Sequence, residues 1–167
     1  MKPGIYWINN STAGKLGIAL RPRGGDWLTN EIQNWKRAGV DVAVSMLMRD
    51  EEEELGLRAE KKLCREQGIE FHSLPVPDRG VPKAKEPALK LAARLHHELE
   101  HGRNVIIHCR QSVGRSSLLA TAVLMQEGIS PSVAIHDISM ARKMEVPETA
   151  EQREWIDTLP VVHVERR

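Results

Sequence analysis

Short apolar runs alternate along the chain with longer segments in which apolar side chains recur every three or four residues. Runs of the first kind, bounded by turn residues, are typical of strands, and the second spacing is typical of amphipathic helices. We expect strands at residues 5–8, 16–20, 40–46, 69–74 and 105–108. We expect helices at residues 27–38, in a stretch that follows the acidic run 50–54 and ends near 67, at 87–101, 116–128 and 130–144, and after residue 149. With 167 residues, the chain is expected to form a single domain, 1–167.

Capping residues mark where several of these helices begin. Ser130, followed by a proline, has the order of an N-cap and a first-turn proline. Thr149 and Gln152 have the spacing of a capping box, in which each side chain accepts a hydrogen bond from the backbone of the other residue. For the first helix, Asp26 or Thr29 is the candidate N-cap.

The segment from residue 69 to residue 108 has the order strand, loop, helix and strand. A crossover of this kind is almost always right-handed, so the two strands are expected to run parallel. The loop at 75–82 contains three prolines and one glycine, and Asp78 is its carboxylate. Cys109 follows directly after the second strand. Both residues are therefore expected beyond the carboxyl ends of strands, where open α/β sheets bind their ligands.

Residues 108–116, His-Cys-Arg-Gln-Ser-Val-Gly-Arg-Ser, join the last apolar run to the helical segment that follows it. The five residues between Cys109 and Arg115 can form a loop whose backbone N–H groups point inward at a helix N-terminus, which suits a dianion such as phosphate. The same groups favour a thiolate at Cys109, because cysteines in such settings have a pKa of roughly 3.5–7.5. Arg115 can bind two phosphate oxygens at once, and the Ser116 hydroxyl can donate a hydrogen bond to the sulfur. The loop therefore indicates a nucleophilic cysteine that faces a phosphate.

These nine residues resemble the signature of the cysteine-dependent protein tyrosine phosphatases, His-Cys-x5-Arg-Ser/Thr, and above all its small, dual-specificity-like branch. The resemblance is strong over roughly residues 70–130. It implies an α/β fold with a central, mostly parallel sheet flanked by helices. It also implies hydrolysis of phosphomonoesters through a phosphocysteine at Cys109, with no metal and no other cofactor.

The resemblance assigns roles to further residues. Asp78, in the sequence Pro-Val-Pro-Asp, is similar to the aspartate that protonates the leaving oxygen in the family. His108, before the cysteine, would orient the loop. The family usually has a glycine where this chain has Ser112, whose side chain makes a positive φ costly. The phosphate would be held by the loop residues and the arginine, which are Arg110, Gln111, Ser112, Val113, Gly114 and Arg115.

Gln152 has two interpretations. Members of the family can use a glutamine after the signature helix to position the water that hydrolyses the phosphoenzyme, and Gln152 resembles that residue. The capping box accounts for the same glutamine without any part in the reaction. The sequence leaves both interpretations open.

Three other features have an ordinary structural explanation beside a functional one. The acidic run at 50–54 is expected to be a solvated face that complements the positive end of a helix. Cys64 is expected in the core, and the alternative is a resolving cysteine that forms a reversible disulfide with oxidised Cys109. The pattern His97-Glu98-x-x-His101 matches that of zinc proteases, but Gly102 ends the helix at once, so we expect a polar face without a metal.

The sequence narrows the substrate only in part. Classical tyrosine-specific members carry an added phosphotyrosine-recognition loop with an aromatic clamp, and neither Tyr6 nor Phe71 lies in such a motif. We therefore expect a shallow pocket that accepts phosphotyrosine, and also phosphoserine or phosphothreonine, in proteins. Because Arg110 adds positive charge inside the loop, a phosphoinositide or another small polyanion is the alternative substrate.

Two alternatives lie outside this class of enzyme. A catalytically weak relative could use the loop only to bind phosphoproteins, but Cys109, Arg115 and Asp78 are all present, which argues against it. A sulfurtransferase also has a loop cysteine before a helix, yet its chemistry needs no acid such as Asp78.

Composition and charge limit the partners. The formal net charge is +1, so nothing favours binding to nucleic acid or to a membrane surface. Two cysteines do not make a disulfide framework, and a reducing, cytoplasmic compartment suits a thiolate nucleophile. The expected partners are a phosphorylated protein or a small phosphoester, and a monomer is the expected state.

Overall fold

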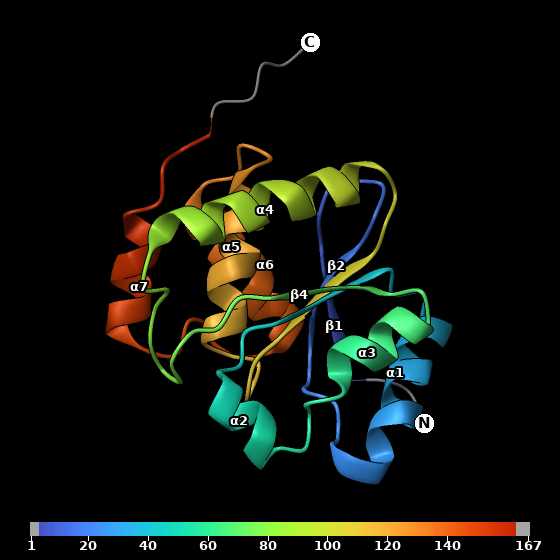
Figure 1. The fold of residues 1–167 in the computed structure, drawn as a ribbon. Helices are drawn as coiled ribbons and strands as arrows, with labels where there is room; N and C mark the ends of the chain where they lie inside the picture. Colours follow the sequence, from blue (N-terminus) through green and yellow to red (C-terminus); the bar gives the residue numbers. More distant parts are fainter. Residues whose placement is uncertain (1–3, 163–167) are drawn as a thin grey trace.

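The computed structural model describes residues 4–162, which form a central five-stranded sheet with helices on both faces (Figure 1). The strands are β1 (Ile5–Ile8), β2 (Leu16–Ala19), β3 (Val42–Ser45), β4 (Glu70–Ser73) and β5 (Val105–His108). The helices are α1 (Leu28–Arg37), α2 (Arg49–Glu54), α3 (Glu60–Glu66), α4 (Lys85–Glu100), α5 (Arg115–Met125), α6 (Pro131–Arg142) and α7 (Ala150–Asp157), and the short 3-10 helix η1 (Gly25–Trp27) precedes α1.

The order of strands in the sheet is β1-β2-β5-β3-β4. β2, β5, β3 and β4 run parallel to one another, and β1 pairs with β2 in the antiparallel direction. This confirms the predicted α/β fold with a mostly parallel sheet. The parallel pairs require crossover connections, and helices supply them on both faces of the sheet.

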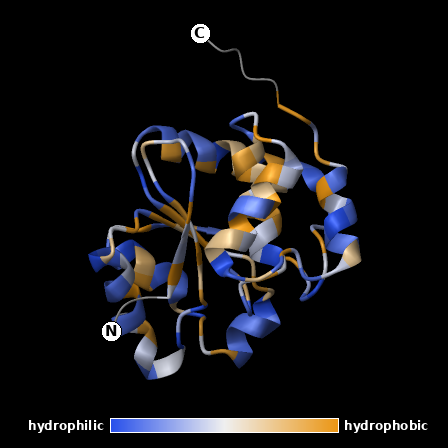
Figure 2. Cartoon of the chain, turned by 180° about the vertical axis from the view of Figure 1, so that it is seen from behind, coloured by the Kyte–Doolittle hydropathy of each residue, from blue (hydrophilic) through white to orange (hydrophobic). Residues whose placement is uncertain are grey.

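Two apolar cores cover the two faces of the sheet. Helices α4, α5, α6 and α7 pack on one face and α1 and α3 on the other (Figure 1). The hydropathy colouring shows apolar residues along the strands and on the inward sides of the helices (Figure 2). Every residue of α5 is buried, so the helix that follows residues 108–114 is held on all sides. Between residues 4 and 162, none of the helices combines the length and the apolar character needed to cross a bilayer.

The carboxyl ends of three neighbouring parallel strands lie together on one side of the sheet, where these strands end. Ser45 at the end of β3 is aligned with Ser73 of β4 and with His108 of β5. The Met46 N–H donates to the His108 carbonyl at 3.0 Å, and the Leu74 N–H donates to that of Ser45 at 2.9 Å. The loops that leave β3, β4 and β5 therefore start side by side, as the crossover argument predicted for those after β4 and β5.

Most predicted elements are confirmed to within a few residues, and the exceptions have local causes. The acidic run, expected to precede a helix that ends near 67, is itself a helix, α2, and Gly56 with a φ of +70° lies between it and α3. The predicted N-caps Asp26 and Thr29 are wrong, since η1 leads directly into α1, whose N-cap, Trp27, makes no side-chain cap bond. The predicted caps Ser130 and Thr149 are confirmed.

Candidate active site

Residues 109–114 form a loop, here called the signature loop, that connects β5 to the N-terminus of α5. Cys109 is buried at its start, with 3% of its surface exposed. In the described part of the chain, the backbone N–H groups from Arg110 to Gly114 donate to no other residue. Unused N–H groups beside the positive end of an eleven-residue helix are the arrangement that binds anions in proteins.

Ser112 adopts the left-handed conformation that the missing glycine suggested. Its φ is +58°, a region in which a side chain is unfavourable. The side chain is buried, and its hydroxyl donates to the carbonyl of Ala19 at the end of β2. The hydrogen bond to the sheet therefore compensates for the backbone conformation that a glycine would adopt without strain.

Arg115, the first residue of α5, has a buried guanidinium, with 1% of the side chain exposed. Nη1 lies 2.6 Å from Glu51 Oε1 and 2.7 Å from the Val76 carbonyl, and Nη2 lies 2.9 Å from Glu51 Oε2. Burial alone would lower the pKa of Arg115, but the Glu51 hydrogen bond and the negative charges of Cys109, Glu51 and Asp78 raise it above its usual value. The arginine is therefore a fixed positive charge with a set orientation.

The buried position of Glu51 corrects the expectation that the acidic run at 50–54 is wholly solvated. Glu51 lies in α2 and turns inward to Arg115, whereas Glu53 and Glu54 of the same helix are exposed. Burial would raise the pKa of Glu51, but the bonds from Arg115 and from the Met48 N–H bring it below 4.5. Sequence reasoning missed Glu51 because nothing in a run of acidic residues marks which one faces the core.

Asp78 lies on the loop after β4 and contacts the first residue of α5. Its Oδ1 is 3.1 Å from Arg115 Nη2, and about half of its side chain is exposed, at 53%. Val76, two residues before Asp78, ties this loop to its surroundings. Its N–H donates to the Met46 carbonyl, and its carbonyl accepts from Arg115. The predicted meeting of Asp78 with the cysteine-arginine loop is therefore observed at Arg115.

His108 and Ser116 lie at the two ends of the signature loop and are fully buried. His108 Nε2 is 2.6 Å from Glu60 Oε2, and the ring of Trp35 packs 5.9 Å away, which fixes the imidazole. The Ser116 hydroxyl has no hydrogen-bond partner among residues 4–162, so the expected bond to the Cys109 sulfur is not formed in this structure. A buried hydroxyl without a partner is unusual, because most such groups are satisfied.

Gln152 forms the predicted capping box and also reaches the site. Its Oε1 accepts the N–H groups of Glu148 and Thr149, and its Nε2 donates to the Gly80 carbonyl at 3.0 Å. A methyl group on Gly114 would lie 2.7 Å from its Nε2. The buried amide therefore connects the start of α7, the loop that carries Asp78 and the signature loop.

Arg110 points to the acidic face of α2. Nη2 lies 3.1 Å from Glu54 Oε1, and Nη1 lies 3.7 Å from Glu51 Oε2. The hydrogen bond from Arg110 lowers the pKa of Glu54, and the same contact raises the pKa of Arg110. The positive charge of Arg110 is thus compensated by α2.

Two of the features with open interpretations lie away from this site. Cys64 packs in the core of α1 and α3, on the opposite face of the sheet from the core that contains Cys109, and both cysteines are free thiols. Burial, followed by the charge of Glu60, raises the pKa of Cys64. His101 lies beyond the last residue of α4 as its C-cap, so the pattern at 97–101 is not carried by one continuous helix.

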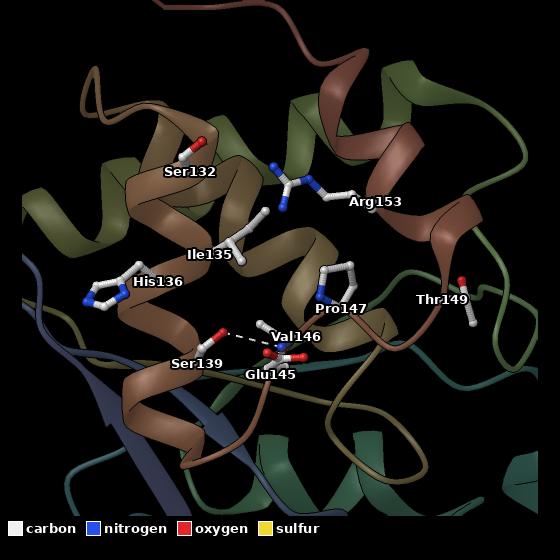
Figure 3. A pocket seen from close by; sticks show the side chains of 9 residues that line it. All are labelled: Ser132, Ile135, His136, Ser139, Glu145, Val146, Pro147, Thr149 and Arg153. Carbon is white, nitrogen blue, oxygen red and sulfur yellow. Dashed lines mark hydrogen bonds between the residues drawn. The ribbon is translucent and has the colours of Figure 1, made fainter.

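A groove of about 500 Å³ lies between α6 and α7 (Figure 3). Ile135 points into it from α6 and Arg153 from α7, and the Val146 N–H that donates to Ser139 Oγ forms part of its wall. None of residues 108–116 lines it. The groove is therefore separate from the anion site of the signature loop.

The comparison with protein families decides to which group this arrangement belongs. The model of the family "Cyclin-dependent kinase inhibitor 3 (CDKN3)" matches residues 27–135, more than half of the chain, including the loop of Asp78 and the signature loop. The chain belongs to the cyclin-dependent kinase inhibitor 3 family. Its predicted resemblance to the dual-specificity-like phosphatases is thereby confirmed.

Individual proteins agree with this family. Cyclin-dependent kinase inhibitor 3 from Rattus norvegicus is 30% identical over 96 residues, which are 56% of this chain and 45% of the relative. Laforin from Mus musculus is 34% identical over 56 residues, 34% of this chain and 17% of that protein. The chain thus spans less than half the length of these curated members and relatives of the family.

Solved structures show the same fold over nearly the whole chain. A kinase associated phosphatase whose catalytic site cysteine is replaced by serine has a TM-score of 0.81 and 22% identity, with 93% of each chain covered. Tk-PTP in its active form has a TM-score of 0.76 and 25% identity, with 94% of this chain and 96% of that one covered. This member of the cyclin-dependent kinase inhibitor 3 family therefore has the fold of the cysteine-dependent phosphatases.

Proposed function

We propose that this chain hydrolyses phosphomonoesters of phosphoproteins, with Cys109 as nucleophile and Asp78 as general acid and base. The single observation that carries the proposal is the contact of Asp78 with Arg115 at the mouth of the signature loop. The contact brings Asp78, from the loop after β4, to the proposed anion site after β5, where the buried Cys109 lies. Membership of a family whose structural relatives are phosphatases supports the same conclusion.

In the first step the Cys109 thiolate attacks phosphorus, and the bond from phosphorus to the leaving oxygen breaks. Asp78 gives its proton to that oxygen. The loop N–H groups and Arg115 bind the three remaining oxygens, whose charge they stabilise without reorganisation. An incoming phosphate takes the place of Asp78 on Arg115 Nη2, which leaves the carboxyl beside the leaving oxygen.

In the second step water attacks phosphorus, the bond from phosphorus to sulfur breaks, and Asp78 accepts a proton from the water. Cys109 leaves as a thiolate, and the buried Ser116 hydroxyl has a hydrogen bond to spare for it. Gln152 lies between the Asp78 loop and the signature loop, and its Nε2 retains a second hydrogen that could orient the water. We propose this role for Gln152 in addition to its capping box.

The substrate proposed here is a phosphorylated residue of a protein, phosphotyrosine and also phosphoserine or phosphothreonine. A polyanionic substrate such as a phosphoinositide is less favoured, because Glu54 and Glu51 already compensate Arg110. We also propose that residues 1–167 form one catalytic domain that works as a monomer in the cytoplasm, where its thiol stays reduced.

The test is hydrolysis of p-nitrophenyl phosphate from pH 5 to 8 with reductant and without added metal. Cys109→Ser should abolish turnover. Asp78→Asn should lower kcat about 10²–10⁴-fold, the usual range for general acid catalysis, and flatten the fall of kcat on the alkaline side, where an acid loses its proton. Cys64→Ala and Asp26→Asn are matched controls away from the site and should retain native rates. Absence of turnover in the reduced native chain would contradict the proposal and favour a phosphoprotein-binding module.

A further inference from the structure

Arg142, the last residue of α6, lies behind the signature loop with its guanidinium buried. Only 6% of the residue is exposed. Nε donates to the Ser112 carbonyl at 2.9 Å, Nη2 approaches the Gln111 carbonyl at 3.5 Å, and the group lies over the ring of Tyr6, 4.3 Å from its centroid. In the described part of the chain no carboxylate forms an ion pair with Arg142. A buried cation without an acidic partner is unfavourable unless its donors are used, so these contacts with the loop are its main compensation.

The two carbonyls that Arg142 binds belong to particular peptide groups. The Gln111 carbonyl shares its peptide with the N–H of Ser112, and the Ser112 carbonyl shares its peptide with the N–H of Val113. In a trans peptide the carbonyl and the N–H point in opposite directions. Arg142 therefore holds two oxygens on the outside of the loop and thereby directs two N–H groups to its inside.

Ser112, which lies between these two peptides, is held from a second side. Its φ of +58° is unfavourable for a residue with a side chain, and its hydroxyl donates to the Ala19 carbonyl of β2. Arg142 from α6 and Ala19 from β2 thus fix the backbone of the same residue. A loop with a glycine at this position would need neither anchor to adopt the angle, although it would be freer to leave it.

We propose that Arg142 is a positioning residue that keeps the signature loop in its anion-binding conformation and strengthens its N–H donors. The inference rests on the proposed function of the loop. Arg142 touches neither the substrate nor the reacting atoms. Its positive charge lies at the oxygen ends of two peptide dipoles whose N–H ends face the phosphate, so it favours a dianion through those peptides.

The experiment measures binding of inorganic phosphate by calorimetry and hydrolysis of p-nitrophenyl phosphate, for native, Arg142→Gln and Arg142→Lys chains. Arg142→Gln should weaken phosphate binding about tenfold or more and raise KM in parallel. Arg142→Lys keeps the charge but cannot bind two carbonyls with a planar fork, so it should lose about threefold. A lysine variant that binds phosphate as tightly as the native chain would overturn the proposal, even if the glutamine variant fails to fold.

Two controls separate positioning from a loss of stability. Arg153→Gln removes an arginine of α7 whose side chain is half-exposed and pairs with Asp157 instead of the loop. Ile32→Val lowers stability through the core on the other face of the sheet. Both should bind phosphate as the native chain does. If Ile32→Val, at an equal fall in Tm, loses as much phosphate affinity as Arg142→Gln, Arg142 has only a structural role and the proposal is wrong.

The two readouts also separate this inference from the proposed function. A native chain that binds phosphate but does not hydrolyse the ester would refute the phosphatase activity, while a tenfold loss of binding in Arg142→Gln would still support the role of Arg142. A native chain that binds no phosphate would overturn both. Unchanged phosphate affinity in a folded Arg142→Gln variant would overturn the positioning role alone.

Discussion

Glu51 binds Arg115 with both carboxylate oxygens, Oε1 at 2.6 Å from Nη1 and Oε2 at 2.9 Å from Nη2. Such a bidentate pair fixes the plane of the guanidinium as well as its position. Because Glu51 also accepts the Met48 N–H at 3.0 Å, the start of α2 sets the orientation of the first residue of α5. A helix after β3 thus determines how the arginine after β5 directs its remaining N–H donors.

Replacing Glu51 by Gln should impair both stability and activity. The amide cannot accept from both guanidinium nitrogens, and it leaves a buried positive charge without its anion. We expect a loss of about 1.5–3 kcal/mol in the free energy of unfolding, the range for hydrogen bonds to charged groups, and a fall of kcat/KM of at least tenfold. Chemical denaturation and p-nitrophenyl phosphate kinetics measure the two effects. Glu53, on the same helix as Glu51, forms an exposed pair with Arg58, and Glu53→Gln should change stability by less than about 0.5 kcal/mol.

The pair with Arg115 also shows where prediction from the sequence stopped. The sheet, the crossover and the place of Asp78 depend on local patterns and on a chirality rule, so they could be predicted from the chain alone. The choice of Glu51 among five consecutive acidic residues depends on the break at Gly56 and on the angle at which α2 meets the sheet. These are tertiary features without a local pattern.

Arg142 illustrates the same limit from another side. A basic residue near the end of a helix is ordinary, because it complements the negative helix end. Its burial follows from the packing of α6 against β1, which places Tyr6 beneath the guanidinium. By contrast, the missing glycine at Ser112 was visible in the sequence, since a family motif specifies backbone conformation at single positions.

Glu52 should destabilise the fold at neutral pH. Burial, and after it the charge of Glu60, raises the pKa of Glu52 above 4.5 in the folded chain. The folded state therefore binds this proton more tightly, and stability is lost as the pH rises through the raised pKa. Glu52→Gln should stabilise the chain at pH 7 by less than about 1 kcal/mol, because water screens a partly exposed carboxyl. At pH 3 the difference in Tm between variant and native chain should vanish, and a constant difference would contradict the electrostatic explanation.

The conformation of Ser112 can be tested by comparing the stabilities of an alanine and a glycine variant. Ser112→Ala keeps the strained φ and removes the hydrogen bond to Ala19, so we expect a loss of about 1–2 kcal/mol. Ser112→Gly loses the same bond but relieves the strain, so it should be about 1 kcal/mol more stable than the alanine variant. Ser117 in α5 is the control, because there alanine should be the more stable of the two, as in any helix. If alanine is the more stable variant at both positions, the backbone of Ser112 is not in the left-handed conformation.

The places of the two cysteines predict a specific response to oxidation. Cys64 is buried on the other face of the sheet with a raised pKa, so it lacks the thiolate that would react with a sulfenic acid at Cys109. Hydrogen peroxide should inactivate the chain without an intramolecular disulfide, as mass spectrometry of the non-reduced protein would show. Cys64→Ala should be inactivated at the native rate. An intramolecular disulfide lowers the mass by two hydrogens. If this mass loss appears in the native chain but not in Cys64→Ala, it would instead support the resolving role of Cys64.

Gly114 and Gln152 should act as one unit. An added Cβ at Gly114 would lie 2.7 Å from Nε2 and 2.8 Å from Oε1 of Gln152, so the amide must leave its bonds to Gly80, Glu148 and Thr149. Gly114→Ala and Gln152→Ala should each cost about 1 kcal/mol, the usual value of a lost cap. In a Gln152→Ala background, Gly114→Ala should cost almost nothing, because its steric partner is gone.

Pre-steady-state kinetics then tests the water role of Gln152. If the amide orients the water of the second step, both variants should release a burst of p-nitrophenol followed by a slower steady rate, since the phosphocysteine accumulates. If Gln152 only caps α7, both variants should lose stability while the ratio of the two steps stays native. Ser130→Ala removes the cap of α6 instead, at a similar cost in stability, and should show no burst under either explanation.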